Sequence, residues 1–151
     1  MSFQQKNITV SLANFTLILV FYLIRIFQMI QGGNFNSTNV FRLWGIIIAL
    51  AIVVTIFATI LTHIVSAIVQ AIKTGEENPK IEDFEDERDK FIDLRGTRVT
   101  YLVSSIGSFL SMLTFVLGQP PLVMFTLLIF FGVVAQIVGD VSRLYLYRRG
   151  F

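Results

Sequence analysis

The chain has 151 residues, of which 54% are hydrophobic and only 15% are charged. Soluble domains usually carry about 25% charged residues, so this composition favours a protein embedded in lipid. The sequence holds no cysteine and one histidine, which excludes disulfides, cysteine nucleophiles and histidine-cluster zinc sites. The net charge of +2 includes no dense basic tract, so we expect no direct binding of nucleic acid.

Four apolar stretches are each long enough to cross a bilayer, whose hydrocarbon core of about 30 Å requires about 20 helical residues. Because lipid cannot satisfy backbone hydrogen bonds and these stretches are apolar on all sides, helices are favoured over a β-barrel. The sequence therefore predicts an all-α membrane protein with a single domain over residues 1–151. Four transmembrane helices form two antiparallel hairpins, with the spans at about 8–31, 43–72, 97–118 and 121–145.

The first span reads as a retained anchor and carries one charge, Arg25, toward its far end. No acidic residue of the chain is expected at that depth. One interpretation is that Arg25 reaches outward and bonds Gln28 or backbone carbonyls. The alternative is an ionic partner on another protein or a lipid phosphate. Arg25 is thus a candidate unpaired intramembrane charge.

The second apolar run is too long for the membrane, and we expect its last third to project past the inner surface. This third contains His63. Polar side chains recur along one face of the run, which favours either close helix packing or a polar path. They are Thr55, Thr59, Thr62, Ser66 and Gln70.

An acidic loop, residues 73–96, joins the second and third spans, and nine of the ten acidic residues lie between Glu76 and Asp93. Phe84, Phe91 and Leu94 recur at roughly helical spacing within it. This pattern predicts a short amphipathic helix at the inner membrane interface before the third span. The loop is either a docking surface for a cytoplasmic protein partner or a solvated connector. Metal binding is a weaker option, since the spacing of a calcium loop is missing.

Within this loop stands the motif Asp86-Glu87-Arg88-Asp89, followed by an arginine-rich approach to the third span. In this motif and in its span pattern, over about half its length, the chain resembles a group of small four-helix bacterial and archaeal membrane proteins of unknown function. Some members of that group sit beside helix-turn-helix regulators. The resemblance therefore implies a regulatory partnership. The four motif residues are the candidate docking site within the charged loop.

The third and fourth spans also carry polar stripes, for which helix packing is the better interpretation. Asp140 lies near the inner end of span four, and Arg143 is one turn away, so the two side chains can form an ion pair. His63 is expected at a similar depth. A contact between His63 and Asp140 is either a proton-responsive pair or a structural hydrogen bond. The third-span stripe is Thr97, Tyr101, Ser104, Ser108 and Ser111, and the fourth-span stripe is Gly132, Gln136, Asp140 and Arg143.

The distribution of lysine and arginine predicts the orientation of the spans. With both termini and the acidic loop in the cytoplasm, ten basic residues lie inside and one lies outside. The positive-inside rule therefore favours this topology. We expect the membrane to be the plasma membrane of a prokaryote.

Taken alone, the sequence favours an accessory or regulatory interaction protein that acts through its acidic loop and can form homo-oligomers. The alternative is a small oligomeric transporter or channel that uses the polar stripes of spans two to four. We expect no enzyme, and so assign no catalytic, cofactor-binding or metal-binding residue, because no nucleophile or base has partners to hold it.

Overall fold

The computed structural model describes residues 3–74 and 87–149, and this part of the chain contains helices and no strand. The side chains of residues 3, 58, 61–63, 65–67 and 69–74 are outside the description. Each described helix is long and apolar enough to cross a membrane, α2 through its segment Ser37–Phe57. The predicted all-α, multi-pass architecture is confirmed to that extent. The helices are α1 (Phe3–Gln31), α2 (Ser37–Thr74), α3 (Glu87–Val116) and α4 (Pro121–Arg149).

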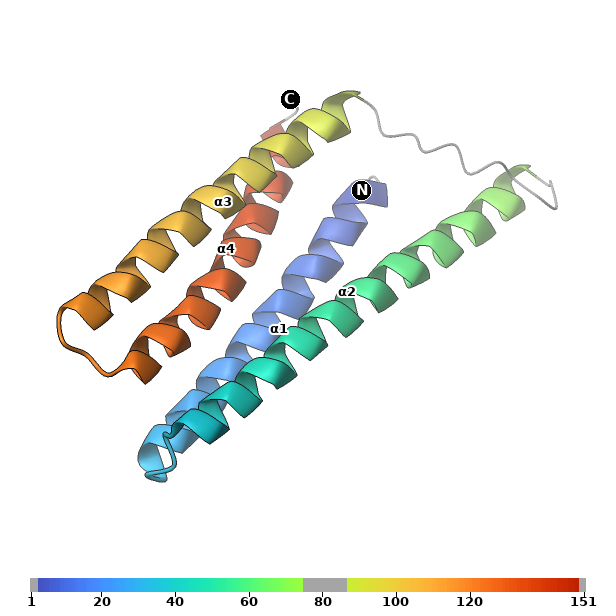
Figure 1. Ribbon diagram of the computed structural model, residues 1–151. Helices are drawn as coiled ribbons and strands as arrows, with labels where there is room; N and C mark the ends of the chain where they lie inside the picture. Colours follow the sequence, from blue (N-terminus) through green and yellow to red (C-terminus); the bar gives the residue numbers. More distant parts are fainter. Residues whose placement is uncertain (1–2, 75–86, 150–151) are drawn as a thin grey trace.

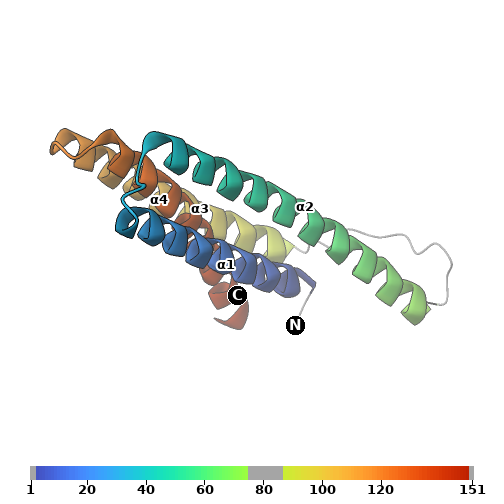
Figure 2. The same ribbon diagram turned by 90° about the horizontal axis from the view of Figure 1, so that it is seen from below.

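The described helices form two antiparallel hairpins, α1 with α2 and α3 with α4 (Figure 1). The first and last helical residues lie toward the same end of the molecule, and both tight turns lie at the opposite end (Figures 1 and 2). Helix α4 is central, because it packs closely against α3 and α1 and also touches α2. The spatial order is therefore α3, α4, α1, α2.

Glycine and asparagine set the two tight turns. Gly33 and Gly118 have φ of 66° and 85°, the left-handed conformation that ends many helices. The amide that follows each glycine bonds back into the preceding helix, from Asn34 to Met29 and from Gln119 to Thr114. Helix α2 begins with a side-chain cap, since the Asn36 Oδ1 accepts a hydrogen bond from the Asn39 amide at 2.9 Å. Helix α4 begins at Pro121, where a missing amide hydrogen costs least.

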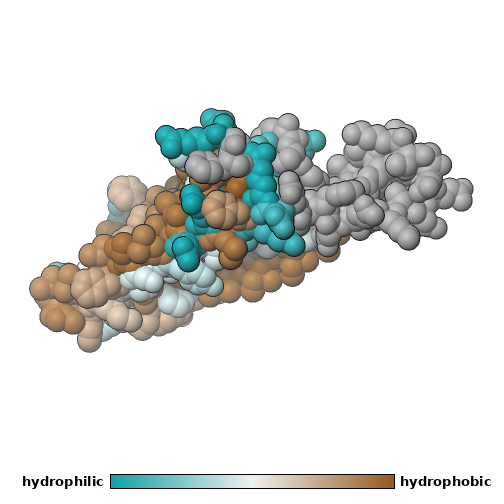
Figure 3. All heavy atoms as spheres, turned by 90° about the horizontal axis from the view of Figure 1, so that it is seen from above, coloured by the Kyte–Doolittle hydropathy of each residue, from teal (hydrophilic) through white to brown (hydrophobic). Residues whose placement is uncertain are grey.

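An apolar cluster joins α1, α2 and α4 in the half of the molecule nearer the turns. The hydroxyl of the buried Tyr22 donates to the carbonyl of Thr126 at 2.6 Å, which ties α1 to α4 inside this cluster. Many other large hydrophobic side chains point outward (Figure 3). An exposed apolar surface of that extent needs lipid around it. The buried residues of the cluster are Ile18, Tyr22, Leu43, Ile47 and Val133.

Small residues let α3 and α4 approach each other closely. A Cβ added to Gly107 would collide with the Cβ and Cγ of Phe131, and one added to Gly139 would collide with Thr100. Ser111 is fully buried and bonds its own helix through the Gly107 carbonyl at 2.7 Å. These contacts support packing as the role of small residues here, although Tyr101 of the predicted stripe is 70% exposed.

Helix α3 begins ten residues earlier than the predicted third span, at Glu87. For Glu87–Arg95 the prediction of a separate short helix is wrong, because these residues are the first turns of α3. No proline interrupts this stretch, so the helix continues from the charged segment into the apolar one. Phe91 and Leu94 are exposed on it, whereas Ile92 is buried. The rest of the predicted interface helix, including Phe84, lies outside the described residues.

Candidate functional site

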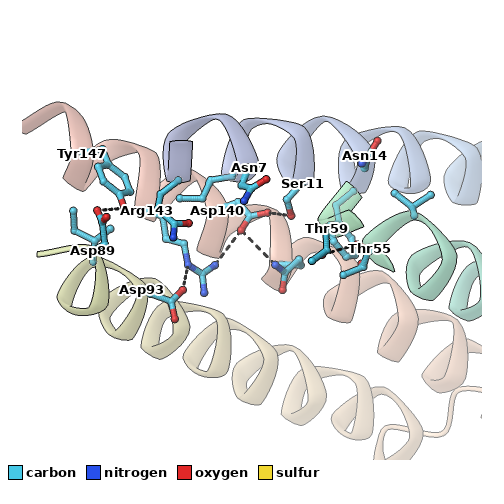
Figure 4. Close-up of a pocket in the computed structure, with 16 residues that line it drawn as sticks. Asn7, Ser11, Asn14, Thr55, Thr59, Asp89, Asp93, Asp140, Arg143 and Tyr147 are labelled. Atoms are coloured by element: carbon cyan, nitrogen blue, oxygen red, sulfur yellow. Dashed lines mark hydrogen bonds and ion pairs between the residues drawn. The ribbon is translucent and has the colours of Figure 1, made fainter. Parts of the chain in front are cut away.

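A polar cleft of about 380 Å³ lies between the helices, in the half of the molecule that carries the termini. Figure 4 shows how its polar side chains converge. Helix α1 contributes polar side chains with Ile8 and Phe15 among them, α2 contributes hydroxyls, and α3 and α4 contribute charges. Hydrophilic residues also gather at this end on the surface (Figure 3). The polar lining residues are Gln4, Asn7, Ser11, Asn14, Thr55, Thr59, Asp89, Asp93, Gln136, Asp140, Arg143 and Tyr147.

The Asp140 carboxylate is the buried centre of the cleft, with only 2% of the residue exposed. Ser11 on α1 donates its hydroxyl hydrogen to Asp140 Oδ2 at 2.6 Å. The Gln136 amide donates to Oδ1 at 3.3 Å, and the Arg143 guanidinium donates to the same oxygen at 3.0 Å. A buried carboxylate persists only where such donors replace water. Asp140 therefore joins α1 to α4 by a direct hydrogen bond.

Arg143 links this centre to α3. Its Nε donates to Asp93 Oδ1 at 2.9 Å, and a terminal nitrogen donates to the Thr97 hydroxyl at 2.9 Å. Room for the side chain comes from Gly96, since a Cβ at that position would collide with the Arg143 chain. The guanidinium uses its forked donors on two carboxylates and one hydroxyl, which lysine could not do with the same geometry.

A second contact fastens the start of α3 to the end of α4. The Tyr147 hydroxyl donates to Asp89 Oδ1 at 2.6 Å, and the Arg88 guanidinium lies 5.9 Å from the centre of the Tyr147 ring. Tyr147 is buried, and so is Ile92 on the first turns of α3. The charged first turns of α3 are therefore held against α4 by two of their carboxylates, Asp89 and Asp93.

The structure brings together some of the predicted site residues. The Asp140–Arg143 ion pair expected from their spacing is present. The side chain of His63 lies outside the described residues, so the His63–Asp140 contact stays a prediction. Arg25 is exposed and bonds Gln28 at 3.3 Å, one of the two interpretations given above. Among the described residues Arg25 has no acidic partner.

The candidate docking motif is described from Glu87 onward, and Asp86 lies outside the described residues. Glu87 and Arg88 are exposed, and so is the neighbouring Lys90. Asp89 is half-buried and turned toward Tyr147. The described part of the motif therefore divides into an outward-facing side and one residue that holds the helix in place.

Sequence reasoning missed the contribution of α1 to the cleft. Gln4, Asn7, Ser11 and Asn14 follow each other at spacings of three, four and three, which places them on one face of a helix. That spacing was a visible signal. Polar stripes were predicted only on the other spans, where Thr55 and Thr59 do reach the cleft.

The cleft ends at the apolar cluster, which occupies the half of the interior nearer the turns. In the described residues no group of three histidine, cysteine or acidic side chains is placed to hold a metal ion. What the cleft offers is hydrogen-bond acceptors, a few donors and a buried ion pair, which suit binding of a polar group. Comparison with protein-family models, with curated proteins and with solved structures finds no match for this chain.

Proposed function

We propose that the protein is an accessory or regulatory membrane protein that binds a cytoplasmic protein partner through its acidic segment and the first turns of α3. The termini and the acidic segment face the cytoplasm in this proposal, and the membrane is a prokaryotic plasma membrane. The observation that carries it is the attachment of the start of α3 to α4 through Asp89 and Asp93.

This attachment matters because a binding surface is most effective when it is held rigid before the partner arrives. Asp89 and Asp93 face α4, while Glu87, Arg88 and Lys90 remain exposed on the same turns. A partner that binds the acidic segment would therefore meet a helix that is fixed to the rest of the molecule. The chain resembles small four-helix membrane proteins in its motif at residues 86–89. The regulatory partnership which that resemblance implies agrees with such a role.

Recovery of a bound partner tests this proposal. We expect that replacing the exposed charges, by Glu87→Gln and Lys90→Gln together with neutral residues at acidic positions 76–86, lowers partner recovery from solubilised membranes at least tenfold. The reason is that complementary charge governs the encounter and register of such contacts. The matched control is Arg42→Gln, a charge removed near the opposite end. Equal recovery by the wild type and the neutralised variant would contradict docking.

Orientation has its own test, because the chain has no cysteine and any introduced thiol is unique. Thr38→Cys and Gln119→Cys place thiols at the two tight turns, and Lys90→Cys and Arg149→Cys place them at the other end. In intact cells a membrane-impermeant maleimide is expected to label the first two and to reach the last two only after permeabilisation. The reverse pattern would overturn the proposed topology.

The cleft favours the second candidate, a small oligomeric transporter, because it includes Thr55, Thr59 and Asp140 from the predicted polar stripes. The apolar cluster beyond it argues against a path through one copy. Solute flux in proteoliposomes that disappears in the His63→Ala, Asp140→Asn double variant would favour transport over docking.

A further inference from the structure

Two asparagines in the cleft have unused hydrogen-bonding groups. The side-chain amides of Asn7 and Asn14 are half-buried, line the cleft and bond to nothing among the described residues. An amide inside a membrane bundle that finds no partner is unfavourable, so its donors and acceptor are available to a bound molecule. The hydroxyls of Thr55 and Thr59 donate hydrogen bonds to the Ala51 and Thr55 carbonyls, respectively. Their oxygens can still accept a hydrogen bond.

The two ends of the cleft differ in charge (Figure 4). Three carboxylates line the charged end of the cleft, those of Asp89, Asp93 and Asp140, and the lining cation among the described residues is Arg143. Arg88 lies nearby against Tyr147. The acidic groups still outnumber the basic ones, and Asp140 is buried, where charges interact more strongly than in water. At the other end Asn14, Thr55 and Thr59 are polar without charge. The lining therefore favours a ligand whose cationic group lies at the acidic end of the cleft.

An ammonium group fits these features better than a metal ion does. It presents three N–H donors and no acceptor, which matches a wall rich in carboxylate, amide and hydroxyl oxygens. The described residues contain no cluster of three ionisable ligands for a divalent metal. The volume of about 380 Å³ lies within the range of small-molecule sites, about 300–1,000 Å³.

We propose that this cleft binds the primary ammonium group of a small amine. The side-chain oxygen of Asn7 accepts a hydrogen bond from the ammonium group, which lies at the end lined by the carboxylates. The ammonium has two sources that share this chemistry: a free amine in the cytoplasm, and the head group of an ethanolamine lipid at the inner surface. This site is distinct from the proposed docking surface, because the charges proposed to meet a partner, Glu87, Arg88 and Lys90, do not line the cleft.

The test uses the full chain in phosphatidylcholine nanodiscs, titrated calorimetrically with ethanolamine, choline or sodium chloride at constant ionic strength. A second arm uses native mass spectrometry to count phosphatidylethanolamine retained from mixed-lipid nanodiscs. Wild-type protein is expected to bind ethanolamine saturably, or to retain phosphatidylethanolamine, and the positive arm identifies the source. Choline should bind at least tenfold more weakly than ethanolamine, because its nitrogen carries no hydrogen.

The decisive variant is Asn7→Ala with Asn14→Ala, which removes lining amides that hold no other described residue. Binding in the positive arm is expected to fall at least tenfold, with an unchanged unfolding temperature. The matched control is Thr9→Val with Thr16→Val on the exposed face of the same helix, which should stay within twofold of wild type. The proposal is overturned by a negative result in both arms, by choline or sodium binding as tightly as ethanolamine, or by full binding in the asparagine variant.

Discussion

Replacing Arg143 by alanine is expected to destabilise the protein by about 3–5 kcal/mol, the usual cost of removing one partner of a buried ion pair. Asp140 is 3% exposed at its side chain and Arg143 is 12% exposed, so the ion pair is largely shielded from water. The same change releases Asp93 and Thr97, so α3 loses two of its bonds to α4. Unfolding in mixed micelles of increasing dodecyl sulfate fraction measures this loss.

Two further variants make the Arg143 experiment interpretable. Arg148→Ala removes an exposed arginine from the same helix, and its effect is expected to stay within about 0.5 kcal/mol. Arg143→Met combined with Asp140→Asn removes both charges of the pair, so part of the stability should return. If Arg143→Ala were no more destabilising than Arg148→Ala, the buried network would not be what joins these helices.

Gly107→Val is expected to cost about 1–3 kcal/mol, because the new side chain meets the Cβ and Cγ of Phe131. These atoms sit next to the α4 backbone, so no side-chain rotation removes the collision and the two helices must separate. Ser111, one turn along the same face, would lose its close packing as well. The same dodecyl sulfate titration measures the loss of stability.

The control for Gly107 lies on the other helix of the pair. A Cβ added at Gly132 meets nothing within 4 Å, and the residue is exposed. Gly132→Val should therefore leave the unfolding transition within about 0.5 kcal/mol of wild type. Equal losses at Gly107 and Gly132 would mean that glycine content, not close approach, controls the stability of this helix pair.

The membrane-crossing helices of the described residues could be predicted because lipid penalises an unsatisfied backbone so strongly. The two tight turns could also be predicted from the sequence, because Gly33, Gly118 and Pro121 have local conformational preferences. The Asp140–Arg143 pair followed from the helical repeat alone. Each of these features depends on residues that are close in sequence.

The pairing of helices could not be predicted in the same way. In lipid the outward and inward faces are both apolar, so hydrophobicity does not reveal which face meets a neighbour. Ser11 and Asp140 are 129 residues apart, and nothing in either local sequence selects the other. Depth in the membrane suggested His63 as a partner of Asp140, whereas the bonds among described residues come from Ser11, Gln136 and Arg143.

The central place of α4 has a consequence for biosynthesis. Among the described helices α4 is the last to be translated, yet it touches every other one. Helices of membrane proteins insert first and associate afterwards. Until α4 has entered the bilayer, Ser11 and Tyr22 lack their acceptors, and Asp89 and Asp93 lack their donors. A nascent chain stalled before α4 would thus hold an α3 without α4 packed against it, a natural target for membrane quality-control proteases.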